Sequence, residues 1–70
     1  MAHKIYTVDA GYECPRCHSK MARIATYHFG CTYQAECATC SCGTADGDDE
    51  GMALARMRGK MLDYADSHKV

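Results

Sequence analysis

Apolar and polar residues alternate at three places in the first half of the chain, as is typical of half-buried β-strands. The first alternating segment is 4–8, which is rich in β-branched and aromatic residues and is followed by a turn signal at 9–11. The other two, 21–28 and 32–36, flank a short tip that carries Gly30, and together they predict an antiparallel hairpin. Alternation along the first hairpin strand places Ile24 on one face and Arg23 and Tyr27 on the other.

After residue 44 the hydrophobic period changes from two to that of a helix. We expect residues 44–50 to turn into an acidic first helical turn, with Asp46 or Asp48 as the N-cap. The helix is predicted from about Asp49 to about Ser67, within a C-terminal segment 48–68. Its apolar stripe consists of Ala53, Leu54, Met57, Met61, Tyr64, Ala65 and His68.

A further face of this helix carries small and apolar residues, namely Gly51, Met52, Ala55, Gly59 and Leu62. Two glycines inside a helix cost roughly 1 kcal/mol each relative to alanine, and close approach of another backbone would offset that cost. The pattern therefore favours a homodimer through this helix or a protein partner. The alternative is that the glycines only mark a weaker or shorter helix.

The chain has 70 residues and fits one domain, 1–70, with a small core. Only seven residues are large aliphatic side chains or phenylalanine, and most of the 47% hydrophobic content is alanine, methionine, tyrosine and cysteine. Backbone ordering alone costs about 1–2 kcal/mol per residue, so a core of this kind needs a further staple. In a cysteine-rich small protein that staple is either a metal ion or a set of disulfides.

Two Cys-x-x-Cys motifs, at 14–17 and 37–40, predict the metal site. This spacing lets a tight turn aim two thiolates at one ion, and two such turns complete a tetrahedral Zn²⁺ site. We predict Cys14, Cys17, Cys37 and Cys40 as ligands, with Cys42 as an alternative fourth ligand because a glycine follows it. Cys31 is left over; a free cysteine is commonly a small buried residue, but at the hairpin tip we expect Cys31 to be more exposed. The predicted fold is a small metal-stapled α+β zinc ribbon, 4–45, followed by one C-terminal helix.

The N-terminus shows no signal-peptide pattern, and the chain has no apolar run long enough to cross a membrane. We therefore expect a cytoplasmic protein that binds zinc, with a disulfide-stapled protein as the alternative.

Charge is nearly balanced: residues 1–45 carry four Lys/Arg against three Asp/Glu, and residues 46–70 carry four against six. Four thiolate ligands would close the zinc shell, and the sequence has no His-Glu-x-x-His motif, so we do not expect an enzyme.

The order of knuckle, hairpin, knuckle and helix resembles small zinc-ribbon proteins, in particular the restriction-alleviation (Lar-like) family of phages and prophages. The resemblance covers about residues 12–65 and rests on Cys14-Pro15-Arg16-Cys17, on residues 36–40 and on the helix from about Asp48. His18 and Ser41 stand where the family has glycines, and the family's Trp-Asn near the helix end is missing. The resemblance implies a zinc ribbon and a small phage-type regulator.

Three functions are compatible with this sequence. The first is a non-catalytic interaction module that binds a protein such as a polymerase, nuclease or restriction component through Met57, Met61, Tyr64 and Gly59. The second is a nucleic-acid-binding zinc ribbon in transcription or translation control that uses Arg16, Lys20, Arg23, Tyr27 and Tyr33. The third is an acidic mimic that uses the carboxylates of residues 46–50. The low content of clustered Lys/Arg places the first ahead of the second.

Overall fold

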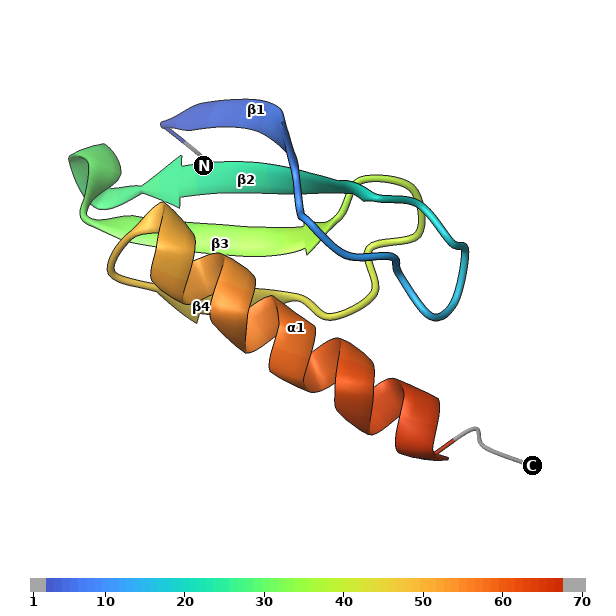
Figure 1. The fold of residues 1–70 in the computed structure, drawn as a ribbon. Coiled ribbons are helices and arrows are strands. Elements are labelled where there is room, and N and C mark those ends of the chain that lie inside the picture. The colour runs from blue at the N-terminus through green and yellow to red at the C-terminus, as the bar shows by residue number, and fades with distance from the viewer. Residues whose placement is uncertain (1–2, 68–70) are drawn as a thin grey trace.

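The computed structural model describes residues 3–67, which form a four-stranded antiparallel sheet with one helix packed on one face (Figure 1). The strands lie in chain order across the sheet: β1 (Lys4–Asp9), β2 (Met21–Tyr27), β3 (Thr32–Cys37) and β4 (Ala45–Gly47). A short 3-10 turn, η1 (His28–Gly30), joins β2 to β3, and the helix α1 (Glu50–Ser67) follows β4. The predicted small α+β architecture with a C-terminal helix is confirmed at this level.

The hairpin of β2 and β3 forms the centre of the sheet with the predicted alternation. Ile24 pairs with Ala35 and Ala22 pairs with Cys37, and all four side chains are buried on the face that α1 covers. Residues on the opposite face, such as Arg23, are more exposed because no helix covers them. The hairpin therefore places Cys37 at the end of a buried row.

Strand β1 pairs with the other side of β2 and reaches the helix through one tyrosine. Tyr6 lies opposite Ile24, and its hydroxyl donates a 2.6 Å hydrogen bond to the Glu50 carboxylate at the start of α1. This hydrogen bond to a carboxylate, together with some desolvation, raises the pKa of Tyr6 to about 12. The contact ties an edge strand to the helix N-terminus across the sheet.

Strand β4 is the element that the sequence did not predict, since we expected a turn over residues 44–50. Ala45 and Gly47 pair with β3 and are buried beneath the helix, while Asp46 between them is exposed. A side chain at Gly47 would lie 2.6 Å from the backbone nitrogen of Ala53, so only glycine permits this approach of strand and helix. Asp46 thus lies in a strand and is not the N-cap.

The helix begins one residue later than the acidic cluster suggested. Asp49 precedes its first residue, and the Asp49 carboxylate accepts a 2.7 Å hydrogen bond from the backbone N–H of Met52. Asp49 is therefore the N-cap in place of Asp46 or Asp48. The predicted stripe faces the sheet, with Ala53, Met57 and Met61 buried and Leu54, Tyr64 and Ala65 half-buried; His68 lies outside the described residues.

The core is made mostly of small side chains. Beside Cys14 and Cys37, it contains Ala22, Ile24, Ala35, Ala45, Ala53, Met57 and Met61. Among these, only the isoleucine and the methionines are large, so apolar burial alone stabilises the fold weakly. Within residues 3–67, no helix is long and apolar enough to cross a membrane.

Candidate metal centre

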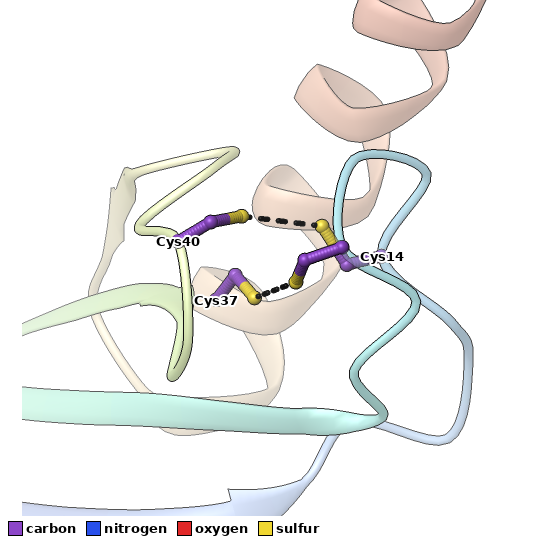
Figure 2. Close-up of side chains that lie close together, drawn as sticks. Cys14, Cys37 and Cys40 are labelled. Carbon is purple, nitrogen blue, oxygen red and sulfur yellow. Dashed lines mark hydrogen bonds between the residues drawn. The ribbon is translucent and has the colours of Figure 1, made fainter.

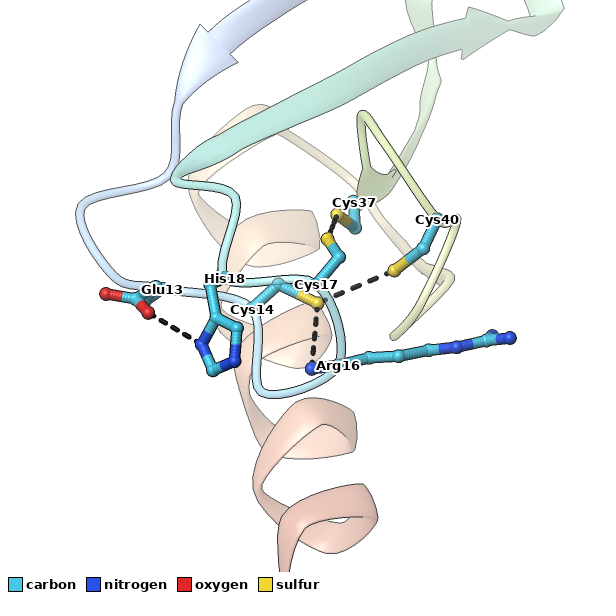
Figure 3. A network of polar contacts seen from close by, with 7 residues as sticks. All are labelled: Glu13, Cys14, Arg16, Cys17, His18, Cys37 and Cys40. Atoms are coloured by element: carbon cyan, nitrogen blue, oxygen red, sulfur yellow. Dashed lines mark hydrogen bonds and ion pairs between the residues drawn. The ribbon is translucent and has the colours of Figure 1, made fainter.

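Four cysteines from two separate loops meet at one end of the sheet. One sulfur atom each from Cys14, Cys17, Cys37 and Cys40 lies within 4.8 Å of the other three. Two sulfur pairs cross from one loop to the other: Cys14 to Cys40 at 3.6 Å (Figure 2) and Cys17 to Cys37 at 3.3 Å (Figure 3). Thiolates bound about 2.3 Å from a tetrahedral ion lie about 3.8 Å apart. The cluster therefore has the spacing that a single metal ion needs.

The first loop, which we call the first knuckle, comprises residues 14–19 between β1 and β2. It is closed by two backbone hydrogen bonds, from His18 N–H to Cys14 O at 2.8 Å and from Cys14 N–H to Ser19 O at 2.9 Å. The backbone N–H of Arg16 points at the Cys14 sulfur at 3.4 Å, while its side chain extends away from the sulfurs (Figure 3). The turn thus supplies both the direction of the thiols and a donor to one of them.

The second knuckle, residues 37–42, follows β3 and has the same backbone pattern. Ser41 N–H donates to Cys37 O at 3.0 Å, and Cys37 N–H donates to Cys42 O at 3.1 Å. Backbone N–H groups of Thr39 and Cys40 donate to the Cys37 sulfur, and that of Cys42 donates to the Cys40 sulfur. Each knuckle is therefore a turn of six residues in which the first and fourth are cysteines.

Equivalence of the two knuckles bears on the choice between Cys40 and Cys42. Cys40 occupies the place that Cys17 has in the first knuckle, and Cys42 occupies the place of Ser19. Ser19 and Cys42 each donate a backbone N–H to the sulfur two residues earlier. The geometry therefore brings Cys40 into the four-sulfur cluster and leaves Cys42 next to it, where burial and the Cys14 thiol raise its pKa.

The residue after the second cysteine of each knuckle has a left-handed backbone. His18 has a φ of 64° and Ser41 a φ of 61°, a region that favours glycine. These are the two positions at which the sequence departs from the glycines of the Lar-like pattern. The turn keeps its shape at both positions, at a cost of roughly 1–2 kcal/mol each for a residue with a side chain.

The thiols are partly desolvated, and each one affects the ionisation of its neighbours. Cys14 and Cys37 are 1% and 0% exposed. Burial opposes ionisation of Cys37, but backbone N–H donors and the neighbouring thiols lower its pKa to about 7. Burial and the three surrounding thiols raise the pKa of Cys40 to about 12. A positive charge at the centre of the cluster would favour ionisation of all four thiols.

Cys31 and the histidines of the described chain are not members of this cluster. Cys31 is exposed beside η1, which is at the opposite end of the sheet from the knuckles (Figure 1). His28 is exposed in the same turn. The His18 ring lies 2.8 Å from the Glu13 carboxylate at the surface (Figure 3).

Residues predicted to contact a partner protein divide into buried and exposed positions. Met57 and Met61 are 0% and 4% exposed, because their side chains fill the space between α1, the sheet and the second knuckle. They are core residues and not part of a binding surface, which corrects the prediction. Tyr64 is half-buried, and Gly59 faces outward with open space around it.

Residues predicted to contact nucleic acid do not form one surface. Tyr27 and Tyr33 lie on opposite faces of the sheet, because Tyr33 pairs with Thr26 and not with Tyr27. Arg23 lies 3.5 Å from the Glu36 carboxylate and also donates to the Ser41 hydroxyl. Arg16 and Lys20 are exposed near the first knuckle. The structure therefore separates the aromatic side chains that we expected to act together.

Comparisons of the chain with protein-family models, with curated proteins and with solved structures found no significant match. The cysteine cluster and the surfaces around it are therefore the features from which a function can be inferred.

Proposed function

We propose that this protein is a non-catalytic zinc-binding interaction module, a small regulator or inhibitor that acts by binding another protein. The observation that carries the proposal is the meeting of four cysteine sulfurs within 4.8 Å, delivered by two knuckles of equivalent geometry. In this proposal the cluster binds one Zn²⁺, residues 4–45 are a zinc ribbon, and the protein works in the cytoplasm. Candidate partners are a polymerase, a nuclease or a restriction component.

The donor set supports zinc as the metal. Four thiolates in a tetrahedral arrangement are typical of structural zinc sites, and zinc needs no redox chemistry or open position there. A Zn²⁺ ion would also supply the positive charge that allows the buried thiols of Cys14 and Cys37 to ionise together. Since the apolar core is small, much of the folding free energy would come from the metal.

A closed shell of four thiolates supports a binding role over catalysis, because it leaves no position for a water or substrate. Several basic side chains already interact with groups of the same molecule. Arg56 and Lys60 donate to the backbone carbonyls of Asp46 and Thr44, and the Arg58 guanidinium lies over the Tyr12 ring. Such engaged cations favour a protein partner over the phosphate backbone of a nucleic acid.

Metal analysis tests this proposal. Protein purified without chelator should contain one zinc per chain by elemental analysis, and chelation should remove the zinc and the folded structure together. Replacement of zinc by Co²⁺ should give the intense absorption of a tetrahedral tetrathiolate site. A folded protein with no bound metal and no free thiols would contradict the proposal and support the disulfide alternative.

A nucleic-acid-binding ribbon is the alternative, and salt dependence separates the two. Binding to single-stranded or duplex oligonucleotides that weakens steeply with salt, and that Arg16→Ala or Lys20→Ala reduces, would support it. We expect no oligonucleotide binding at physiological salt, since the described basic residues are few and partly engaged.

A further inference from the structure

Helix α1 presents apolar side chains to solvent on the side opposite the core. This outer face carries Met52, Ala55, Gly59 and Leu62, which recur at spacings of three or four residues, and it ends at the exposed Asp66. Leu62 also borders the space between α1 and residues 12–15. Met52 is 37% exposed and Leu62 is 58% exposed. A helix whose inner face already fills the core has no need of a second apolar face in a single chain. The outer face is therefore available to a partner.

Beside the outer face, between α1 and β4, runs an open groove of about 540 Å³. It is lined by Ala45, Asp46, Arg56, Gly59, Lys60 and Asp63. Two of these side chains are basic and two are acidic, so the groove has no net charge. The basic side chains are held in place by hydrogen bonds to backbone carbonyls, at 2.9 Å from Arg56 to Asp46 in β4 and at 2.7 Å from Lys60 to Thr44 just before it.

We propose that α1 pairs antiparallel with α1 of a second copy of this chain, with the two helices crossing at Gly59. A two-fold interface requires a surface that is complementary to itself, and a neutral surface with both charges meets that requirement. Arg56 lies three residues before Gly59 and Asp63 four residues after it, on the same flank of the helix. In an antiparallel pair centred on Gly59, Arg56 of each copy lies beside Asp63 of the other.

The apolar residues fit the same arrangement. An added side chain at Gly59 would meet nothing within 4 Å in the single chain, so the packing of this fold does not require glycine there. Glycine at the crossing point lets two helix backbones approach closely. Leu62 of one copy then lies against Ala55 of the other. The helix is about 27 Å long, so the interface is smaller than a standard one and the dimer should dissociate in the micromolar range.

Sedimentation equilibrium of the zinc-loaded protein, over concentrations from about 1 to 500 µM, tests this pairing. We expect a monomer–dimer equilibrium, and we expect Leu62→Glu to raise the dissociation constant about tenfold or more. Met21→Glu is the matched control: Met21 is 42% exposed but belongs to the sheet, and its substitution should leave dimerisation unchanged. A monomer at every concentration, or a dimer that Leu62→Glu leaves intact, would overturn the proposal.

A charge exchange tests the antiparallel arrangement. Arg56→Asp and Asp63→Arg should each weaken the dimer about five- to tenfold, and the double variant R56D/D63R should restore it. Failure of the double variant to recover association would rule out this geometry. The zinc content of every variant should stay at one per chain. That measurement keeps a failure of the dimer distinct from a failure of the zinc site.

Discussion

The two knuckles have the same internal hydrogen bonds but different relations to the rest of the molecule. In each, the first cysteine is buried and the second is half-buried, and the sulfurs pair across the pseudo-symmetric cluster. The second knuckle continues into Gly43, which packs directly on α1: an added Cβ would lie 2.9 Å from Met57 O and 2.9 Å from Met61 Cγ.

The first knuckle meets the helix more loosely. A cavity of about 150 Å³ separates residues 12–15 from the C-terminal half of α1. Contact across it includes a 3.0 Å hydrogen bond from the Tyr12 hydroxyl to Leu54 O and the position of Arg58 over the Tyr12 ring. The second knuckle is thus fixed by packing, whereas the first depends more on the shared four-cysteine cluster. The two knuckles should therefore respond differently to substitution.

Loss of a buried ligand should have the largest effect. Cys14→Ser and Cys37→Ser should each abolish stable zinc binding and most of the folded structure, because the small core cannot replace the metal. Zinc content and circular dichroism measure this. Cys31→Ser is the control, since Cys31 is exposed at the opposite end of the sheet. A folded, zinc-loaded Cys14→Ser variant would show that the first knuckle does not need its buried ligand.

Single substitutions in the second knuckle should show whether Cys40 or Cys42 is the fourth ligand. Cys40→Ser should lower zinc affinity by orders of magnitude, whereas Cys42→Ser should retain one zinc per chain, because Cys42 stands where the first knuckle has Ser19. Competition with a chromogenic chelator gives both affinities. The reverse result would assign Cys42 as the fourth ligand and break the equivalence of the knuckles.

A side chain at Gly43 should disturb the close packing of the second knuckle on α1. Gly43→Ala places a Cβ against the Met57 backbone and adds left-handed strain at φ 77°, so we expect a loss of about 2–3 kcal/mol in unfolding free energy. Gly11→Ala is the matched control, with φ 79° and no atom within 4 Å of the added Cβ. Chemical denaturation of both zinc-loaded variants measures the difference. Equal losses would show that packing at Gly43 contributes nothing.

Relief of backbone strain at the fifth residue of each knuckle should have the smallest effect. Ser41→Gly should stabilise the zinc-loaded protein by about 0.5–1 kcal/mol, because the relief of strain at φ 61° outweighs the larger entropy loss of glycine and the lost exposed hydrogen bond from Arg23. His18→Gly should gain less, since histidine tolerates this conformation better and its contact with Glu13 is lost. The same denaturation measurement ranks the two. Destabilisation by both substitutions would mean that their side chains hold the turns.

Local sequence signals predicted much of this architecture. The three-four spacing of Leu54, Met57 and Met61 identified the helix and its inner side, and the alternation around Ile24 identified the inner face of the hairpin. The two Cys-x-x-Cys motifs identified all four members of the cluster. In each case the pattern is repeated within a few residues, so it can be read without knowledge of distant contacts.

Features that depend on distant contacts could not be predicted in this way. Strand β4 has only three residues, with turn-favouring Asp46 and Gly47, and it forms because β3 and α1 enclose it. The sequence favoured Cys40 but left Cys42 as an alternative, and the position of Cys42 beside the cluster emerges only from a comparison of backbone hydrogen bonds between the knuckles. The separation of Tyr27 from Tyr33 follows from the register of β2 with β3.

The side chains that cover β4 also bear on aggregation. An edge strand with free carbonyl groups can recruit strands from other chains and begin fibril growth. Here Arg56 and Lys60 bond to the outward carbonyls of Asp46 and Thr44 and close this edge with positive charge. Both residues belong to a helix that is synthesised after the strand. A nascent chain that stops before residue 56 lacks both cations, so this side of the sheet, whether it ends at β3 or at β4, stays unprotected until the helix is complete.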